Sequence, residues 1–175
     1  MEMKKMSLSD RVYVLAKKYD IEQNKVHTII TAYTDYCKEM LYNGYRVDLI
    51  GLASLIPDKE RTGLTTTLAY KCRDIAKQLS LPNHTVYVIV QEYLNSLIED
   101  ILKGKPIEIR GILSVVPINN GEKVIKVHSV ISSQLKEHLK ERNTGVTSIR
   151  IHTHKLLKYN VGTSQYSIQS EEFVE

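Results

Sequence analysis

The feature that most constrains the fold is an internal repeat with a period of 60 residues. Shifting the chain by that distance matches residues 7–57 to residues 67–117 without a gap, and 11 of the 51 pairs are identical. Roughly three identities are expected from average residue usage. The identical pairs are Leu8/Leu68, Ala16/Ala76, Lys17/Lys77, Val26/Val86, Ile29/Ile89, Tyr33/Tyr93, Glu39/Glu99, Gly44/Gly104, Gly51/Gly111, Ser54/Ser114 and Pro57/Pro117. An internal repeat constrains the architecture before any motif does, so we expect two copies of one structural unit.

Each copy begins with two helices, because apolar residues recur at helical spacing along both segments. The predicted helices cover 8–19 and 26–41 in the first copy and 68–79 and 86–102 in the second. The apolar stripe of the last helix is widened by Leu94 and Ile98, which predicts burial on two sides. The second helix of each copy is expected to end at Asn43-Gly44 or Lys103-Gly104, since glycine is common just after a helix.

A short β-hairpin follows each pair of helices. The alternation in residues 47–49 and 107–109 is typical of half-buried strands, with Asp48 and Glu108 between apolar neighbours. Gly51 and Gly111 lie within the predicted reversals, where glycine allows unusual backbone angles or a close approach of chains. We therefore take four recurring glycines as signature positions of the fold, namely Gly44, Gly51, Gly104 and Gly111.

The two copies differ after the hairpin. The first continues into a polar connector, residues 58–63, whereas the second has a turn at 119–121, a third strand over 124–130 and a short helix ending near residue 142. A further strand is predicted within 146–157. We expect an α+β chain with a first unit over 1–62, a second unit with an extra strand and helix over 63–158, and a polar tail over 159–175.

Helix, turn, longer helix and glycine-containing hairpin together resemble the HU/IHF family of bacterial histone-like proteins. Two stretches carry the resemblance, Asn43-Gly-Tyr-Arg-Val-Asp-Leu-Ile-Gly-Leu-Ala-Ser and Lys103-Gly-Lys-Pro-Ile-Glu-Ile-Arg-Gly-Ile-Leu-Ser. It covers residues 7–57 and 67–142. The phenylalanine that the family has after the glycine is replaced by Leu52 and Ile112. The resemblance implies two HU/IHF-like units in tandem, which pair with each other or each with a neighbouring chain.

One departure from the family concerns DNA binding. Proteins of this family hold DNA with a long basic β-arm between the second and third strands, and an apolar wedge on the arm, usually a proline, kinks the duplex. The second copy has only Asn119-Asn120-Gly121 at this place, and no proline follows Pro117. The first copy has its connector there. We therefore expect the long DNA-binding arms to be missing.

The charge distribution agrees with missing arms. The net charge is +4, with nine basic and nine acidic residues in 1–60, seven and five in 61–120, and eight and six in 121–175. A tight, salt-sensitive DNA-binding protein contacts about six to ten phosphates, and no segment here concentrates that much positive charge. Acidic partners are permitted by this charge but not implied by it.

Targeting and enzymatic signals are not found in the sequence. No apolar run follows Lys4 and Lys5, and no stretch approaches the roughly 18 apolar residues of a membrane span, so neither a signal peptide nor a membrane segment is predicted. Cys37 and Cys72 lie in apolar helical patterns and are predicted to be buried thiols of a reducing compartment.

We expect no catalytic activity, cofactor or metal, because the nucleotide-loop, serine-elbow, zinc-helix and paired-cysteine motifs do not occur. The spacing His152-x-His154 would place two rings on one face of a strand. No third ligand is apparent nearby in the sequence, so exposed strand residues are the preferred interpretation.

Two groups of residues are candidates for partner contacts. Tyr36 and Tyr45 lie off the apolar helix stripe or at its end, where tyrosine offers apolar area with a polar tip. Basic residues on predicted strands or their ends would touch phosphate if they shared a sheet face, although a solvated outer face is the preferred interpretation. These basic candidates are Lys105, Arg110, Lys123, Lys126 and Arg150.

The family resemblance suggests a function. Tandem IHF-like proteins are known as connector and tail-ring components of crAss-like phages, and the chain looks like that group. This implies a non-enzymatic virion protein, assembled in the host cytoplasm, whose partners are further copies of itself in a ring and neighbouring virion proteins. No membrane or small-molecule substrate is expected, and DNA contact would be weak. The alternative is an HU/IHF-type DNA-binding protein of the bacterial cytoplasm and nucleoid.

Overall fold

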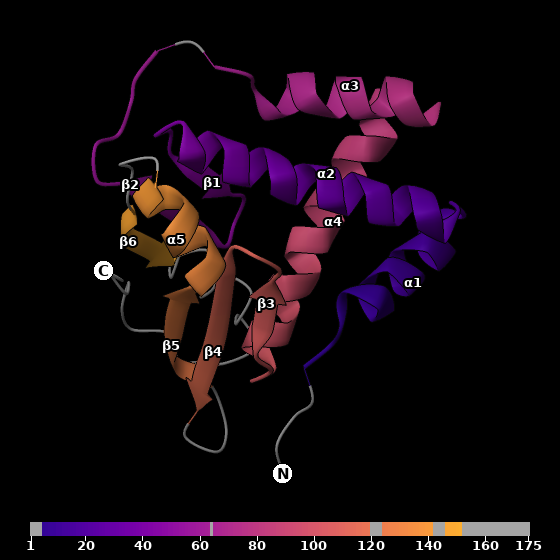
Figure 1. Ribbon diagram of the computed structural model, residues 1–175. Helices are drawn as coiled ribbons and strands as arrows, with labels where there is room; N and C mark the ends of the chain where they lie inside the picture. The colour runs from indigo at the N-terminus through magenta and orange to yellow at the C-terminus, as the bar shows by residue number, and fades with distance from the viewer. Residues whose placement is uncertain (1–4, 64, 120–123, 142–145, 152–175) are drawn as a thin grey trace.

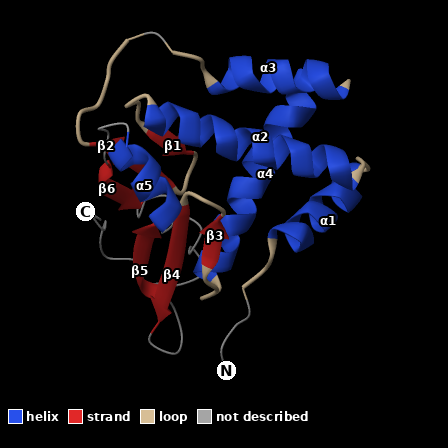
Figure 2. Ribbon diagram, viewed as in Figure 1, coloured by secondary structure: helices blue, strands red, loops and turns tan. Residues whose placement is uncertain are grey.

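The computed structural model describes residues 5–63, 65–119, 124–141 and 146–151, which form an α+β fold of helices and two small antiparallel sheets (Figures 1 and 2). The expected α+β class is confirmed. In chain order the elements are α1 (Leu8–Tyr19), α2 (Gln23–Tyr42), β1 (Val47–Leu49), β2 (Ala53–Pro57), α3 (Leu68–Leu79), α4 (Asn83–Leu102), β3 (Ile107–Ile109), β4 (Leu113–Asn119), β5 (Val124–Ile131), α5 (Ser133–Glu141) and β6 (Val146–Ile151).

The helix–helix–hairpin order recurs with the 60-residue period of the sequence. The bounds of α1, α2 and β1 become those of α3, α4 and β3 when 60 is added. The signature glycines repeat their geometry as well, with φ of 83° at both Gly44 and Gly104, 80° at Gly51 and 79° at Gly111. Such positive φ angles are unfavourable for residues with a Cβ atom, which explains why glycine recurs at both hairpin reversals.

Local capping interactions set the helix ends. Ser7 caps α1, accepting a hydrogen bond from the Asp10 amide while the Asp10 carboxylate accepts one from the Ser7 amide. Thr67 caps α3 by accepting from the Tyr70 amide. Pro82 occupies the N-cap position of α4, and no side-chain hydrogen bond caps this helix.

The third strands of the two sheets come from different places in the sequence. One sheet has the order β3-β4-β5, as expected from consecutive strands, and the other has the order β1-β2-β6. Strand β6 pairs antiparallel with β2, with residue 149 opposite Leu55 and residue 151 opposite Ala53. The second unit predicted over 63–158 includes this strand, and its pairing with β2 makes β6 the third strand of the sheet of the first half.

The two halves share one hydrophobic core. Helix α2 contacts α4, and each short helix contacts the long helix of the other half, since α1 lies against α4 and α3 against α2. Each hairpin reversal also approaches the long helix of the other half. A Cβ atom on Gly51 would lie 3.2 Å from Ile98 on α4, and one on Gly111 would lie 2.7 Å from the Lys38 ammonium on α2. Residues 38 and 98 are equivalent in the repeat, so the halves exchange equivalent contacts.

The long helix of the second half is more deeply buried than that of the first. Helix α4 buries nine residues and α2 buries seven, and the additional apolar ones are Leu94 and Ile98. This confirms the two-sided burial predicted from the wider stripe. Helix α5 covers the first half, because it packs on α2 with His138 tilted against the ring of Tyr42 at 5.8 Å between centroids.

Candidate functional site

The repeat creates two clefts at equivalent places, one in each half. The basic cleft, about 270 Å³, is lined by Leu8, Arg11, His27, Ile30, Thr31, Thr34, Asp35, Lys38, Tyr93, Glu108, Arg110, Gly111 and Gln134. The apolar cleft, about 460 Å³, is lined by Tyr33, Tyr36, Cys37, Met40, Arg46, Val47, Asp48, Ile50, Thr67, Leu68, Ala69 and Tyr87. Equivalent lining positions are Leu8/Leu68, His27/Tyr87, Glu108/Asp48, Arg110/Ile50 and Tyr93/Tyr33.

Most charged groups of the basic cleft are already paired. The Arg11 guanidinium donates to the Asp100 carboxylate at 2.8 Å, and the exposed fractions of these side chains are 3% and 9%. Lys5 donates to Glu108 at 2.6 Å, and Lys38 lies 4.0 Å from Asp35, whose side chain is 66% exposed.

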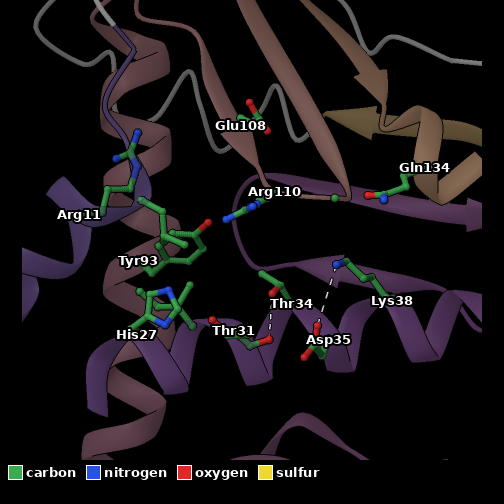
Figure 3. Close-up of a pocket in the computed structure, with 13 residues that line it drawn as sticks. Arg11, His27, Thr31, Thr34, Asp35, Lys38, Tyr93, Glu108, Arg110 and Gln134 are labelled. Atoms are coloured by element: carbon green, nitrogen blue, oxygen red, sulfur yellow. Dashed lines mark hydrogen bonds and ion pairs between the residues drawn. The ribbon is translucent and has the colours of Figure 1, made fainter. Parts of the chain in front are cut away.

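Arg110 differs from these residues, because it has neither an ion pair nor a hydrogen bond with any part of the chain that the structure describes. In Figure 3 its guanidinium and the hydroxyl of Tyr93 extend into the same space of the cleft. Burial is the main reason that the pKa of Tyr93 rises to about 12. The phenol is therefore neutral at physiological pH and can donate a hydrogen bond to an anion.

The apolar cleft contains a buried hydroxyl without a hydrogen-bonded oxygen or nitrogen. Tyr33 is 2% exposed, and its hydroxyl has no such partner among the described residues. Burial raises its pKa well above the ordinary value, and the neighbouring Cys37 thiol and Tyr93 raise it further. Burial also raises the pKa of Cys37 to about 12, so this thiol is protonated and unreactive at neutral pH.

The tyrosines predicted as partner contacts make contacts within the chain. Tyr36 is half-buried and donates a hydrogen bond of 2.8 Å to the Thr66 carbonyl, which ties the segment just before α3 to α2. Tyr45 is half-buried too, and the Arg61 guanidinium lies over its ring at 5.2 Å. No sequence pattern indicated these partners, because each lies well along the chain from its tyrosine.

The basic candidates do not gather on one sheet. Arg110 follows β3 and lines the basic cleft, Lys105 is half-buried before β3, and Lys126 is exposed on β5. Arg150 lies on β6, in the other sheet, opposite Ser54. Lys123 is outside the described residues, as are His152, His154 and the whole predicted tail. The proposed phosphate-binding face is thus divided between two sheets.

The outward face of the β4–β5 ribbon carries an apolar strip that the sequence reasoning missed. Val116, Ile118 and Val130 are exposed by 47%, 43% and 42%. Val116 lies opposite His128 and Ile118 opposite Lys126, while the alternate residues of both strands are buried. The alternation along residues 113–119 was a signal for this face, since it places apolar residues on both sides of one strand. Figure 1 shows the ribbon extending away from the helices.

No group of three or more His, Cys, Asp or Glu side chains among the described residues could hold a metal ion. None of the described helices is long and apolar enough to cross a membrane.

A scan against protein-family models finds no match to the chain, and neither does a search of curated proteins.

Proposed function

We propose that the chain is a non-enzymatic assembly protein built from two HU/IHF-like units in tandem, and that it serves as a connector or tail-ring component of a tailed, crAss-like phage. The observation that carries an assembly function is the apolar strip of Val116, Ile118 and Val130 on the outward face of the ribbon. A surface of this kind, rimmed by polar residues, is typical of protein–protein contact.

The arrangement of the halves supports two units that pair within one chain. Each short helix lies on the opposite long helix, and each hairpin reversal approaches the opposite long helix at residues 38 and 98. A chain that pairs internally leaves its outer faces available for other partners. The proposed partners are further copies in a ring and neighbouring virion proteins, and the proposed location is the virion, after assembly in the host cytoplasm.

Nucleoid-type DNA binding is the second candidate. The feature that favours it is the β4–β5 ribbon with Lys126 and His128 on its outward face. Only four residues separate the two strands, and three apolar side chains lie on that face. A DNA-binding arm needs several phosphate contacts, so this ribbon fits a protein partner better than a duplex.

Native mass spectrometry of the purified chain, alone and with a 30-base-pair duplex, tests the proposal. We expect a closed multimer that is indifferent to DNA, and we expect Val116→Ser/Ile118→Ser to reduce the chain to monomers. The matched control is Val14→Ser, because Val14 is an exposed apolar residue on α1 at 52%. Circular dichroism verifies that each variant is folded. A stoichiometric DNA complex that survives moderate salt would overturn the proposal and restore the nucleoid function.

A further inference from the structure

The basic cleft has one more positive than negative side chain lining it. Its lining contains Arg11, Lys38 and Arg110 against Asp35 and Glu108. Arg11 and Glu108 are already engaged with partners outside this set. Among the described residues, the charge without a partner is therefore that of Arg110. A guanidinium binds a carboxylate through two parallel hydrogen bonds, so the group that best completes this cleft is one carboxylate.

We infer that the basic cleft binds the acidic C-terminal segment of this chain, residues 164–175, through a glutamate carboxylate held by Arg110. Lys38 and the Tyr93 hydroxyl are placed to contribute, since both line the same cleft (Figure 3). Leu8 and Ile30 provide apolar lining for a side chain next to the carboxylate. The inference is independent of the proposed function, because it depends only on the cleft and on the chemistry of the segment.

The segment has the complementary charge. Residues 159–175 contain three glutamates, Glu171, Glu172 and Glu175, and no Lys, Arg or His. Phe173, the single phenylalanine of the chain, lies beside two of these glutamates and offers a ring for the apolar lining. An acidic residue flanked by an aromatic one thus matches a cleft that combines the Arg110 guanidinium with apolar side chains.

The segment is long enough to reach the cleft. Strand β6 ends at residue 151, and the following 24 residues span about 80 Å when fully extended. A domain of this size is about 40 Å across, from its expected radius of gyration of about 16 Å. The segment can therefore reach the cleft of its own chain.

The equivalent cleft provides an internal reference. Ile50 stands where Arg110 stands, Ile98 stands where Lys38 stands, and Tyr87 replaces His27. The cation that lines the apolar cleft, Arg46, is already paired with Asp48 at 2.9 Å and also donates to the Ser54 hydroxyl. If charge directs the segment, it will occupy one cleft and not the other, although both clefts have similar backbone geometry.

Paramagnetic relaxation in the full-length chain tests the inference. A spin label is attached through Ser170→Cys, and Cys37 and Cys72 are buried, which protects them from labelling. We expect the amides of Thr34 and Gly111 in the basic cleft to relax about two- to fivefold faster than those of Thr67 and Ala69 in the apolar cleft. Equal relaxation at the two clefts, or none at either, would overturn the inference.

Variants show whether Arg110 is responsible. Arg110→Ile copies the residue that the other half has at this position, so we expect it to fold, and Arg110→Gln is a second variant in case it does not. Each should lower the docked population up to about fivefold, the range for an exposed ion pair. Arg73→Gln on α3 removes the same charge from an exposed position outside the cleft and should change nothing. An unchanged relaxation pattern in both Arg110 variants would contradict the assignment.

Mixing two samples identifies the source of the segment. Spin-labelled chains without ¹⁵N are combined with ¹⁵N-labelled chains without the spin label. Relaxation in the mixture shows that a second copy donates its segment, whereas relaxation restricted to the doubly labelled chain shows docking within one molecule. Only docking within one molecule agrees with the inference, and relaxation in the mixture would overturn it. Failure of this docking leaves ring formation untouched, because native mass spectrometry measures the latter separately.

Discussion

The contact of α1 with α4 and the contact of α3 with α2 occupy equivalent places but differ in chemistry. In the first, the Arg11 guanidinium forms a buried ion pair with Asp100 and also donates to the Ser96 hydroxyl at 3.1 Å. In the second, the equivalent residues are Lys71, Met40 and Tyr36, which gather around a cavity of about 190 Å³. The Thr65 hydroxyl donates to the Met40 sulfur at 3.2 Å there.

This difference shows that the repeated backbone does not require repeated side chains. A buried ion pair costs desolvation of both charges, so a methionine at the same place can stabilise equally well. The pair distinguishes the two halves, because Arg11 finds a carboxylate on α4 but would meet Met40 at the equivalent position of α2. We interpret it as a specificity contact that gives the chain an asymmetric interior.

The largest expected effect comes from breaking this ion pair alone. Asp100→Met copies the other half and leaves the Arg11 charge buried without its partner, which should lower the free energy of unfolding by about 3 to 5 kcal/mol. The double variant Arg11→Leu/Asp100→Met removes both charges and should recover most of the loss. Urea denaturation of both variants measures this. Equal destabilisation by the single and double variants would refute the specificity interpretation.

Substitution of the hairpin glycines should destabilise the two halves to different extents. Gly51→Ala and Gly111→Ala both place a Cβ atom at positive φ, which costs about 1 to 2 kcal/mol. At Gly51 the new methyl also meets buried Ile98 at 3.2 Å, adding about 1 kcal/mol or more, whereas at Gly111 it meets the movable end of Lys38. Denaturation should therefore show a larger loss for Gly51→Ala. The reverse order would mean that Lys38 is held rigidly.

Alkaline pH should destabilise the protein through groups concentrated at the crossing of α2 and α4. The raised pKa values of Cys37, Tyr33 and Tyr93 mean that the unfolded chain loses these protons at lower pH than the folded one. Stability is therefore complete below about pH 9 and falls as the pH rises towards 12. Cys37 alone contributes a loss of about 2 kcal/mol between pH 8.5 and 10.5.

Denaturation curves at a series of pH values measure this slope, and Cys37→Ala serves as the reference because it removes one titrating group. The slope of that variant should be shallower than that of the natural chain. A slope unchanged by the substitution would show that other groups control alkaline unfolding.

The smallest effect concerns the equivalent tyrosines. Tyr33→Phe removes a buried hydroxyl that has no oxygen or nitrogen partner among the described residues, so the free energy of unfolding should stay constant or rise by about 1 kcal/mol. Tyr93→Phe is the matched variant in the basic cleft and should be neutral or slightly destabilising. Thermal unfolding of the two variants compares them, and a clear loss of stability in Tyr33→Phe would indicate a partner for its hydroxyl.

Much of the local structure could be predicted from the sequence. The spacing of apolar residues located α1 to α4 and most of α5, and Gly44 and Gly104 marked the ends of the long helices. The 60-residue match predicted that both halves repeat the same elements. These features depend on residues within a few positions of one another or on a direct comparison of two segments, so the linear sequence contains them.

The candidate site was less accessible to sequence reasoning. Arg110 was recognised as a basic residue near a strand, but its cleft also contains Lys38 and Tyr93, which come from the two long helices. Tyr36 was predicted as a partner contact, and the sequence did not indicate that its hydroxyl donates to the Thr66 carbonyl. Hydrogen-bond partners that are 30 positions apart leave no periodic pattern in the sequence.

The sequence by itself determined the repeated elements, the ends of the long helices and the glycine reversals, because helix periodicity, strand alternation and glycine chemistry act locally. Only the tertiary structure decided that β6 completes the sheet of the first half, that Arg11 reaches Asp100 across 89 positions, and that one cleft is basic and the other apolar. Pairing of this kind depends on which surfaces remain unburied after the two halves pack together, and that is a property of the whole folded chain.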